Sequence, residues 1–480
     1  MSYAQRALPF EARELGHDSW VAVSSAGDFA FLSLDELQLL RHEPAALPLV
    51  KQAELQAKHF LRSVGSSASG LDRLLRSRQL AKKETTVGGP TLHIIVPTLQ
   101  CAHTCRYCQV SRSLEDTGFS LGNKDLDDIC ATIFESPAEK LTIEFQGGDP
   151  LLRFDLVRYG IEQVSRLAEE RGKKVRIVVA STLHQLDGEM CDFFKVHGVF
   201  LSTSIDGPSW LHNKNRPLRT RDSYERTVAG IALARDRLGS EAVAALMTAT
   251  GESLKYPQEI VDEYVRLGFR EIFLRPLSLY GFAKRNQALL GYGVRRYQDF
   301  YERALDRVEF WADQGVEMRE VYASIVLNKL LSTFDSGYVD LQSPTVAGQA
   351  VLVYNYDRFV YPSDEARMLA ESGDQSLRMG RIDEPLTELL GSPVREQLAQ
   401  SGDASLNASC SKCAYQTYCA PNPIDAQAQL GRMSADAADT DHCARHIALF
   451  DFWLRRLRSA SPERLDRYHS WADCGGSRER

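Results

Sequence analysis

Short apolar runs, separated by longer amphipathic stretches, recur along the middle of the chain. Six of these runs have the length and composition of strands: residues 92–98, 140–146, 175–182, 199–206, 242–250 and 271–277. Most of the stretches between them have the pattern of helices. Strands that alternate with helices predict βαβ units and a parallel sheet. We therefore expect an α/β fold, a partial (β/α)6 barrel with its chemistry on loops at the carboxyl ends of the strands.

Other patterns flank this region. Residues 19–32 are two apolar runs around a turn, which predicts a hairpin, and Ser33 is placed to cap a following helix. Residues 296–331 are mostly helical in pattern, and residues 351–364 again predict a hairpin. This organisation divides the chain into an N-terminal α+β module with its linker (1–85), the barrel (86–285), bridging helices (286–340), a C-terminal cysteine-rich domain (341–455) and a tail (456–480).

Composition and charge exclude some classes of function. The chain is 44% hydrophobic and 25% charged, as is usual for globular proteins. Its net charge of −7 argues against nucleic acid as a partner, since nucleic acid favours basic surfaces. No apolar run approaches the roughly 18 residues that suggest a membrane span, and the start lacks the pattern of a signal peptide. We expect a cytoplasmic protein without nucleic-acid or membrane partners.

The uneven distribution of the ten cysteines is the strongest indication of function in the sequence. Three lie within residues 101–108 and four lie between residues 410 and 443. In a reducing compartment, clustered cysteines indicate metal binding rather than disulfides. Of the others, Cys130 and Cys191 fit small buried apolar positions, and Cys474 fits a loose tail.

The first cluster follows the strand 92–98 directly, with thiols at Cys101, Cys105 and Cys108. A C-x3-C-x2-C triplet gives a [4Fe–4S] cluster three thiolates and leaves one iron open. That iron can chelate S-adenosylmethionine (SAM), and electron transfer to the sulfonium then yields an adenosyl radical. Zinc is the alternative, with His103 as a fourth ligand, although three cysteines so close together fit zinc poorly.

Two further motifs follow later strands. The first is the run Gln146, Gly147, Gly148 and Asp149. Paired glycines let backbone approach a ligand closely, and carbonyls exposed there can accept from an ammonium group. In the second motif, Ser204 and Asp206 suit ribose hydroxyls, and Arg216 suits a carboxylate. Taken alone, each motif is typical of a turn.

Together and in this order, CxxxCxYC, GGDP and SIDGP with a following arginine resemble the radical SAM superfamily, specifically its peptide-modifying members with a SPASM-type C-terminal domain. The resemblance implies that Tyr107, Gly148, Ser204 and Arg216 contact SAM. The expected cofactor site also includes Gln146, Gly147, Asp149 and Asp206. Asp149 stands where the family usually has Glu, and we expect the shorter carboxylate still to reach a polar group.

The same resemblance gives a meaning to the second cysteine cluster. Its members form a C-x2-C-x5-C triplet and a later single cysteine: Cys410, Cys413, Cys419 and Cys443. SPASM domains hold two auxiliary [4Fe–4S] clusters, and these four positions match the second ligand set. The first set is missing, since Ser363 and Pro423 stand at two of its cysteine positions. The resemblance therefore implies two clusters in total, and a four-cysteine zinc site is the alternative.

Asp364 follows the second predicted hairpin. In the sulfatase-maturating relatives, the Asp at this place takes a proton from the substrate. The resemblance thus implies a catalytic base or a hydrogen-bonding group, and a structural turn is the alternative.

Longer stretches, such as LHIIVPTLQCAHTCRYCQVSR and TIEFQGGDPLLRFDLVRY, look like the His-Xaa-Ser system radical SAM maturases. This similarity implies a precursor peptide substrate, an electron donor and a second radical SAM protein as partners. The N-terminal hairpin and helices are similar to modules that bind a leader peptide as an added strand. Two alternatives stay open: a radical SAM enzyme that acts on a small molecule, and a non-catalytic, zinc-stabilised adaptor that binds peptide.

Overall fold

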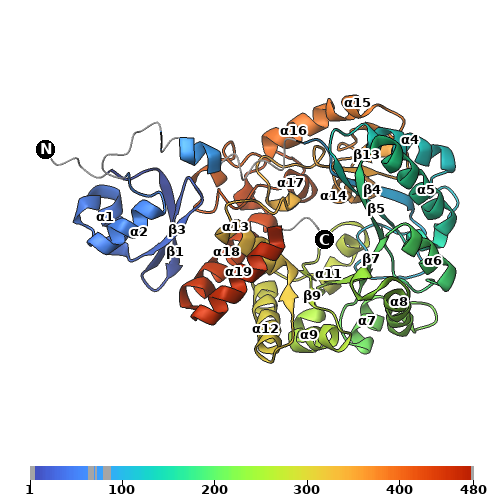
Figure 1. Ribbon diagram of the computed structural model, residues 1–480, viewed down its shortest axis with the longest axis horizontal. Helices are drawn as coiled ribbons and strands as arrows, with labels where there is room; N and C mark the ends of the chain where they lie inside the picture. The colour runs from blue at the N-terminus through green and yellow to red at the C-terminus, as the bar shows by residue number, and fades with distance from the viewer. Residues whose placement is uncertain (1–5, 63–69, 71–72, 79–87, 477–480) are drawn as a thin grey trace. The chain divides into compact units, whose positions relative to one another are not determined.

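The computed structural model describes residues 6–62, 70, 73–78 and 88–476 (Figure 1). The chain divides into two compact units, and each is assembled from separate stretches. The first unit comprises residues 1–87, 322–345 and 399–480, and the second comprises residues 88–321 and 346–398.

The second unit is built on a parallel sheet. Its six parallel strands are β4 (Leu92–Thr98), β5 (Lys140–Gly147), β6 (Lys174–Ala180), β7 (Phe200–Ser204), β8 (Val243–Thr248) and β10 (Leu274–Arg275). They lie in the order β10-β8-β7-β6-β5-β4. This order confirms the predicted α/β barrel fold. The last predicted run is split, because β9 (Glu271–Ile272) pairs instead with β11 (Arg319–Glu320).

Helices follow the strands and pack on one side of the sheet (Figure 1). The main ones are α4 (Asn123–Phe134), α5 (Phe154–Arg171), α6 (Gly188–Val196), α8 (Ser223–Leu238), α9 (Pro257–Arg266) and α12 (Val294–Asp313). Gly160 lets α5 approach β5, since a Cβ there would lie 2.9 Å from the ring of Phe145. Phe145 therefore faces the helices. Because side chains alternate along a strand, Glu144 and Gln146 face the inner side of the barrel.

The predicted hairpin at residues 351–364 is confirmed as β12 (Val351–Tyr354) and β13 (Phe359–Tyr361). Its position differs from the sequence-based division, which groups it with the C-terminal cysteines. β12 pairs in parallel with β4, and β13 pairs with β14 (Gly380–Arg381), so that the hairpin extends the barrel sheet. β12 is buried along its whole length, which suits a central strand and not the edge of a small domain.

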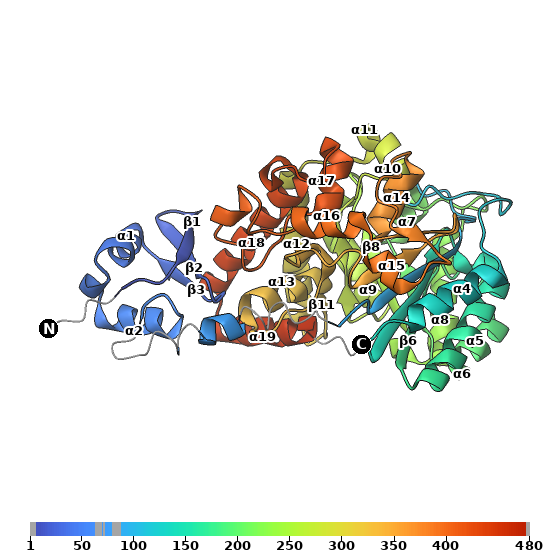
Figure 2. The same cartoon turned by 90° about the horizontal axis from the view of Figure 1, so that it is seen from above.

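Shorter elements complete the second unit. They are α7 (Ser209–Asn215), α10 (Gly281–Arg285), α11 (Gln287–Leu290), α14 (Asp364–Glu371) and α15 (Leu386–Leu390), and α16 (Pro393–Ser401) begins in this unit. Helix α14 runs beside α10 and the barrel strands (Figure 2). Its N-cap is Ser363, whose hydroxyl accepts from the Ala366 N–H at 3.3 Å.

The first unit begins with a three-stranded antiparallel sheet, β1 (Phe10–Gly16), β2 (Ser19–Ser24) and β3 (Phe29–Leu32). β2 and β3 are the predicted hairpin. Two helices follow, α1 (Leu34–His42) and α2 (Leu49–Ala57). Ser33 caps α1 as expected: its hydroxyl accepts from the Glu36 N–H at 3.1 Å, and its own N–H donates to the Glu36 carboxylate at 2.9 Å.

The remainder of the first unit is mainly helical, with α13 (Val321–Leu331), α17 (Pro423–Leu430), α18 (Asp441–Ser459) and α19 (Pro462–Gly476). The expectation of a loose tail around Cys474 is wrong, because Cys474 lies in α19. Helix α19 packs on α18, with the rings of Tyr468 and Trp453 5.3 Å apart. Cys130 and Cys191 are buried, as predicted.

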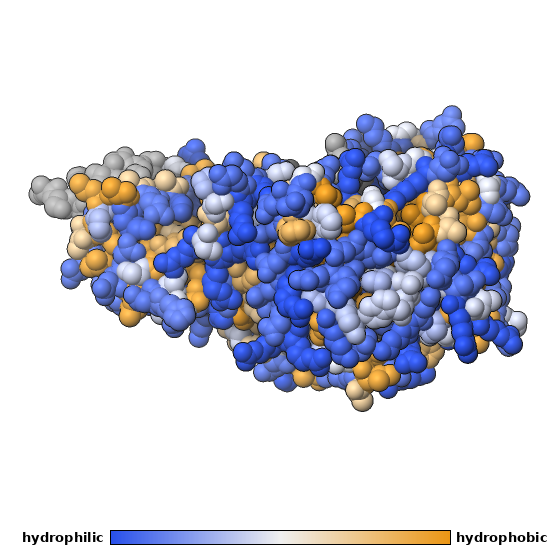
Figure 3. All heavy atoms as spheres, turned by 90° about the horizontal axis from the view of Figure 1, so that it is seen from below, coloured by the Kyte–Doolittle hydropathy of each residue, from blue (hydrophilic) through white to orange (hydrophobic). Residues whose placement is uncertain are grey.

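The surface is mostly polar on the face drawn in Figure 3, where apolar residues gather in separate patches. Of the helices that the structure describes, none combines the length and the apolar composition that a membrane span requires.

Candidate functional site

The three clustered cysteines lie on a closed loop at the carboxyl end of β4. Backbone hydrogen bonds hold this cysteine loop, residues 99–121, along both of its sides. The N–H of Leu99 donates to the Phe119 carbonyl at 3.0 Å, and the N–H of Cys101 donates to the Ser113 carbonyl at 2.9 Å. The thiols therefore stand where a parallel barrel presents its chemistry.

The thiols of this loop are close enough to influence one another. Burial raises the pKa of Cys101 well above its ordinary value, and Asp149 and the thiols of Cys105 and Cys108 raise it further. Burial also raises the pKa of Cys105 to about 11. These thiols stay protonated at neutral pH until a metal stabilises the thiolates, and ligand binding would release their protons. Three sulfur donors on one loop fit an iron–sulfur cluster.

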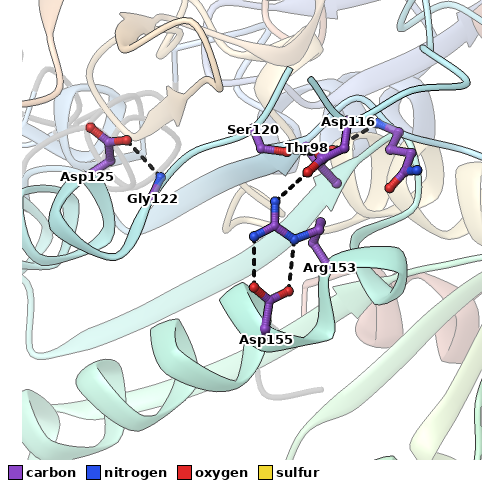
Figure 4. Close-up of polar contacts among 8 residues, drawn as sticks. Thr98, Asp116, Ser120, Gly122, Asp125, Arg153 and Asp155 are labelled. Atoms are coloured by element: carbon purple, nitrogen blue, oxygen red, sulfur yellow. Dashed lines mark hydrogen bonds and ion pairs between the residues drawn. The ribbon is translucent and has the colours of Figure 1, made fainter. Parts of the chain in front are cut away.

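A carboxylate locks the far side of the cysteine loop to the start of α5 (Figure 4). Asp116 accepts from Arg153 Nη1 at 2.6 Å and from Thr98 Oγ1 at 3.0 Å, and the hydroxyl of Ser120 also donates to it. Arg153 holds Asp155 with two further hydrogen bonds, at 2.9 and 2.8 Å. The sequence analysis missed Asp116 and Arg153, which belong to no motif.

The glycine pair at the carboxyl end of β5, Gly147 and Gly148, packs backbone against backbone on the cysteine loop. A Cβ on Gly148 would lie 2.2 Å from the Leu99 carbonyl oxygen and 2.3 Å from that of Gln100. Gly147 has a φ of +136°, which side chains rarely adopt. The N–H of Asp149 donates to the Gln100 carbonyl at 2.7 Å. Only glycine fits here, so the two motifs form one structural site.

Asp149 ties this segment to the loop after β6. Its carboxylate accepts from Ser181 Oγ at 2.7 Å and from Thr182 Oγ1 at 2.5 Å. Burial alone would raise its pKa, but hydrogen bonds from His184, Thr182 and Ser181 outweigh burial and lower it. The expectation that this short carboxylate still reaches a polar group is confirmed.

Three of the predicted cofactor residues meet although they come from separate loops. Arg216 Nη1 donates to the Tyr107 hydroxyl at 2.7 Å, and that hydroxyl donates to Asp206 Oδ1 at 3.0 Å. Burial raises the pKa of Asp206, and the charge of Arg216 opposes this rise. Asp206 Oδ2 is buried and makes no hydrogen bond of ordinary geometry among the described residues, and the side chain of Asn215 lowers the pKa of this carboxylate.

The inner face of β5 carries charge that the sequence analysis missed. Glu144 lies on this face beside Gln146. Burial raises the pKa of Glu144 to about 7, Asp364 raises it, and Gln146 and Arg275 lower it. The alternation in KLTIEFQ, with Thr142, Glu144 and Gln146 at every second position, is the signal that could have revealed it.

Two other predicted site residues lie at the ends of regular elements. Ser204 ends β7. Asp364 begins α14, where Oδ1 accepts from Arg367 Nε at 2.8 Å and Nη2 at 2.5 Å. Arg367 is fully buried. This ion pair fixes the Asp364 carboxylate at the start of α14, and its charge also acts on Glu144. The base role of Asp364 stays a prediction.

His103, the alternative zinc ligand, is buried behind the cysteine loop. Its Nε2 lies 2.9 Å from Ser223 Oγ, and its ring meets that of His184 edge-on at 5.1 Å. Burial lowers its pKa to about 3. The ring is therefore neutral. Nδ1 has no hydrogen-bond partner among the residues described, so a ligand role for that nitrogen stays open.

The four C-terminal cysteines also come together. Each thiol of this C-terminal cysteine site interacts electrostatically with at least one other, and all four are partly buried: Cys410, Cys413, Cys419 and Cys443. Burial raises the pKa of Cys410 to about 12, with Cys443 and Cys413 adding to it. The Tyr415 N–H donates to Cys413 Sγ at 3.4 Å. The set can hold an iron–sulfur cluster or zinc.

Two histidines that the sequence analysis missed stand beside this site. Ring nitrogens of His442 and His446 lie within 4.8 Å of each other and of Cys419 Sγ. His446 Nδ1 pairs with the His442 carbonyl at 2.8 Å, and its Nε2 pairs with the Tyr322 hydroxyl. Burial lowers the pKa of His446 to about 4. Neutral imidazoles bind zinc well, so this pair keeps the zinc alternative open.

Comparison with known proteins agrees with the geometry of the barrel. Residues 95–264 match the family model of the Radical SAM superfamily. This unit has the radical SAM fold. A solved structure extends the similarity: anSMEcpe with bound AdoMet and a peptide has a TM-score of 0.64 at 16% identity, over 77% of this chain and 98% of that one.

A second solved structure covers more of the chain. SuiB from Streptococcus suis, bound to its precursor peptide SuiA, has a TM-score of 0.55 at 14% identity, over 90% of this chain and 98% of that one. At these identities the likeness concerns the radical SAM fold alone.

Among curated sequences, an uncharacterized protein of Synechocystis is 31% identical over 229 residues, 46% of this chain and 56% of that protein. Another uncharacterized protein, from Methanothermobacter thermautotrophicus, is 23% identical over 177 residues, 36% of this chain and 63% of that protein. The chain thus matches less than two thirds of the length of each relative.

Proposed function

We propose that this protein is a radical SAM enzyme that modifies a ribosomally made precursor peptide of the His-Xaa-Ser type. The observation that carries the proposal is the packing of the three-cysteine loop on the glycine pair, with Tyr107, Asp206 and Arg216 beside it. Thiols, a backbone cradle and a partly buried guanidinium are the groups that a cluster and SAM need in one place.

The residues present fit both cofactors. Cys101, Cys105 and Cys108 would hold a [4Fe–4S] cluster, and a set of eight residues would hold SAM: Tyr107, Gln146, Gly147, Gly148, Asp149, Ser204, Asp206 and Arg216. When bound, the pair supplies an adenosyl radical that abstracts hydrogen. The buried Oδ2 of Asp206 and the close backbone at Gly148 are the observations on which this fit rests.

The residues of the chain divide the remaining work. Arg216 offers a permanent positive charge to a carboxylate, and Tyr107 and Asp206 orient it. Asp149 keeps the glycine segment attached to the loop after β6. On the substrate side, Glu144 and Asp364 can hold or move a proton. Glu144 suits exchange near neutral pH, because its pKa of about 7 matches that condition.

The C-terminal cysteine site is proposed to hold a second [4Fe–4S] cluster. Four thiolates leave no iron open for substrate, so its role would be electron transfer or support. Accepting an electron would suit a net oxidation of the peptide. Zinc is the competing occupant, favoured by the imidazoles of His442 and His446.

A peptide substrate is supported by two solved structures of the same fold that contain peptides, SuiB with SuiA and anSMEcpe with its peptide. The N-terminal module adds to this support, since its small sheet and two helices suit recognition of an added strand. An electron donor and a second radical SAM protein complete the proposed partners. A small-molecule substrate is the rival, which the same radical SAM barrel would also accommodate.

The test uses anaerobically reconstituted protein, SAM, dithionite and a synthetic peptide with His-Xaa-Ser repeats. We expect 5′-deoxyadenosine to form and the peptide to change in mass or to take up deuterium from D2O. The Cys101/Cys105/Cys108→Ala variant should form no 5′-deoxyadenosine, and Cys474→Ala, which removes a cysteine outside both clusters, should behave as wild type. SAM cleavage without any change in the peptide would contradict the peptide assignment. Bound zinc without iron would contradict the proposal that the protein is a radical SAM enzyme.

A further inference from the structure

The strand that the sequence analysis missed, β1, has two differently occupied faces. Phe10 and Ala12 pack on the core of the N-terminal module. Because side chains alternate along a strand, Glu11 and Arg13 share the opposite face.

Arg13 makes a specific connection from that face. Its Nε and Nη2 donate to the two carboxylate oxygens of Asp451 at 2.8 and 3.0 Å. The hydroxyl of Tyr415 lies 2.5 Å from the same carboxylate, and the Arg13 guanidinium lies 5.9 Å from the centre of the Tyr415 ring. Tyr415 is part of the cysteine triplet segment, and its backbone N–H donates to Cys413 Sγ.

A second contact joins the same two regions. The hydroxyl of Tyr418, one residue before Cys419, donates to the Gly27 carbonyl in the β2–β3 turn at 2.9 Å. Tyr418 is fully buried. The N-terminal module is therefore attached to the cysteine triplet at two points, and Arg13 is the charged one.

The charges on this face act on the cysteines themselves. Arg13, Asp451 and Glu11 all act electrostatically on the Cys413 thiol, and Arg13 also acts on the Cys443 thiol. On another side, buried Lys329 acts on Cys419. A positive charge at this range stabilises negative charge at the cysteine site, and a negative charge does the opposite.

We infer that Arg13 and Glu11 of the N-terminal module set the reduction potential of the cluster held by the C-terminal cysteines. The inference rests on the proposed function, because it requires a redox-active cluster at that site. A one-electron reduction adds a negative charge to the cluster, so a nearby cation favours the reduced form and a nearby anion disfavours it. The module thereby adjusts how readily this cluster takes an electron.

The test is a dithionite redox titration, followed by electron paramagnetic resonance, on the full chain. The Cys101/Cys105/Cys108→Ala background removes the signal of the first cluster. In this background Arg13→Gln should shift the midpoint to a more negative potential, because Asp451 and Glu11 then act unopposed. Glu11→Gln should shift it to a more positive potential. Glu14→Gln, on the other face of β1, is the matched control and should leave the midpoint unchanged.

The two midpoint potentials should shift in opposite directions, which distinguishes an effect of charge from damage to the fold. A structural disturbance would not shift the potentials of the two variants in opposite directions. Equal midpoints in all variants, with the cluster retained, would overturn the inference and leave the proposed function intact. Absence of any iron–sulfur signal in the triple-Ala background would overturn both the inference and the second cluster. Loss of SAM cleavage in wild-type protein is a separate result, and it concerns the first site only.

Discussion

Many of the single residues at the candidate site belong to motifs whose spacing can be recognised in the sequence. The cysteines, the glycine pair, Tyr107 and Arg216 could be recognised from sequence because each belongs to a spaced motif. Asp116 and Arg153 could not, because they lie far apart along the chain and only folding brings them together. The motif indicates that Asp364 is a base or a hydrogen-bonding group, and the structure adds the buried partner of its carboxylate, Arg367.

Gly148→Ala tests the backbone cradle at this scale. The new Cβ would lie 2.2 Å from the Leu99 carbonyl oxygen, so the cysteine loop must move away. We expect a loss of about 2–3 kcal/mol in the free energy of unfolding, measured by urea titration, and loss of iron from the first site. Gly122→Ala, directly after this loop at the N-cap of α4, would meet its nearest atom only at 3.7 Å and should cost less than about 1 kcal/mol. A Gly148→Ala variant with wild-type stability and iron content would contradict the requirement for glycine at this backbone contact.

The local sequence pattern predicts the helices and strands well, but it does not predict which strands pair with each other. The barrel strands, the hairpins and the Ser33 cap follow from periodicity and capping chemistry, and all are present. The pairing of β12 with β4 does not follow, because strand pairing depends on contacts between distant residues. β1 was missed because FEARELG carries charges on the face away from its own core, which hides the apolar alternation.

The cysteine loop is the element whose fixation matters most to the account. Asp116→Asn removes the negative charge that faces Arg153 and replaces one of the two acceptor oxygens with a donor group, so this lock should weaken. We expect a loss of about 1–2 kcal/mol on urea unfolding and slower iron uptake during reconstitution. Asp155→Asn removes the more exposed partner of the same arginine and should cost less than about 0.5 kcal/mol, with normal iron uptake. Equal behaviour of the two variants would show that Asp116 does not hold the loop.

At the scale of the whole molecule, the order of segments along the chain differs from their order in space. Residues 322–345 and 399–480 join the N-terminal module in one unit, while residues 346–398 join the barrel. The sequence suggests a linear series of domains, because local composition shows where segments change but not which distant segments meet. The three cysteines of the barrel loop all lie in the second unit, and the four C-terminal cysteines all lie in the first. Each metal site is therefore formed within one unit.

The central claim is that the chain carries two iron–sulfur sites of different kinds. The most direct measurement is iron and acid-labile sulfide per chain in anaerobically purified protein, for wild type beside the Cys101/Cys105/Cys108→Ala variant. The account predicts about eight irons falling to about four, which corresponds to two [4Fe–4S] clusters with one of them on the barrel loop. About four irons falling to none would leave the C-terminal cysteines to zinc or to no metal, and would contradict the second cluster.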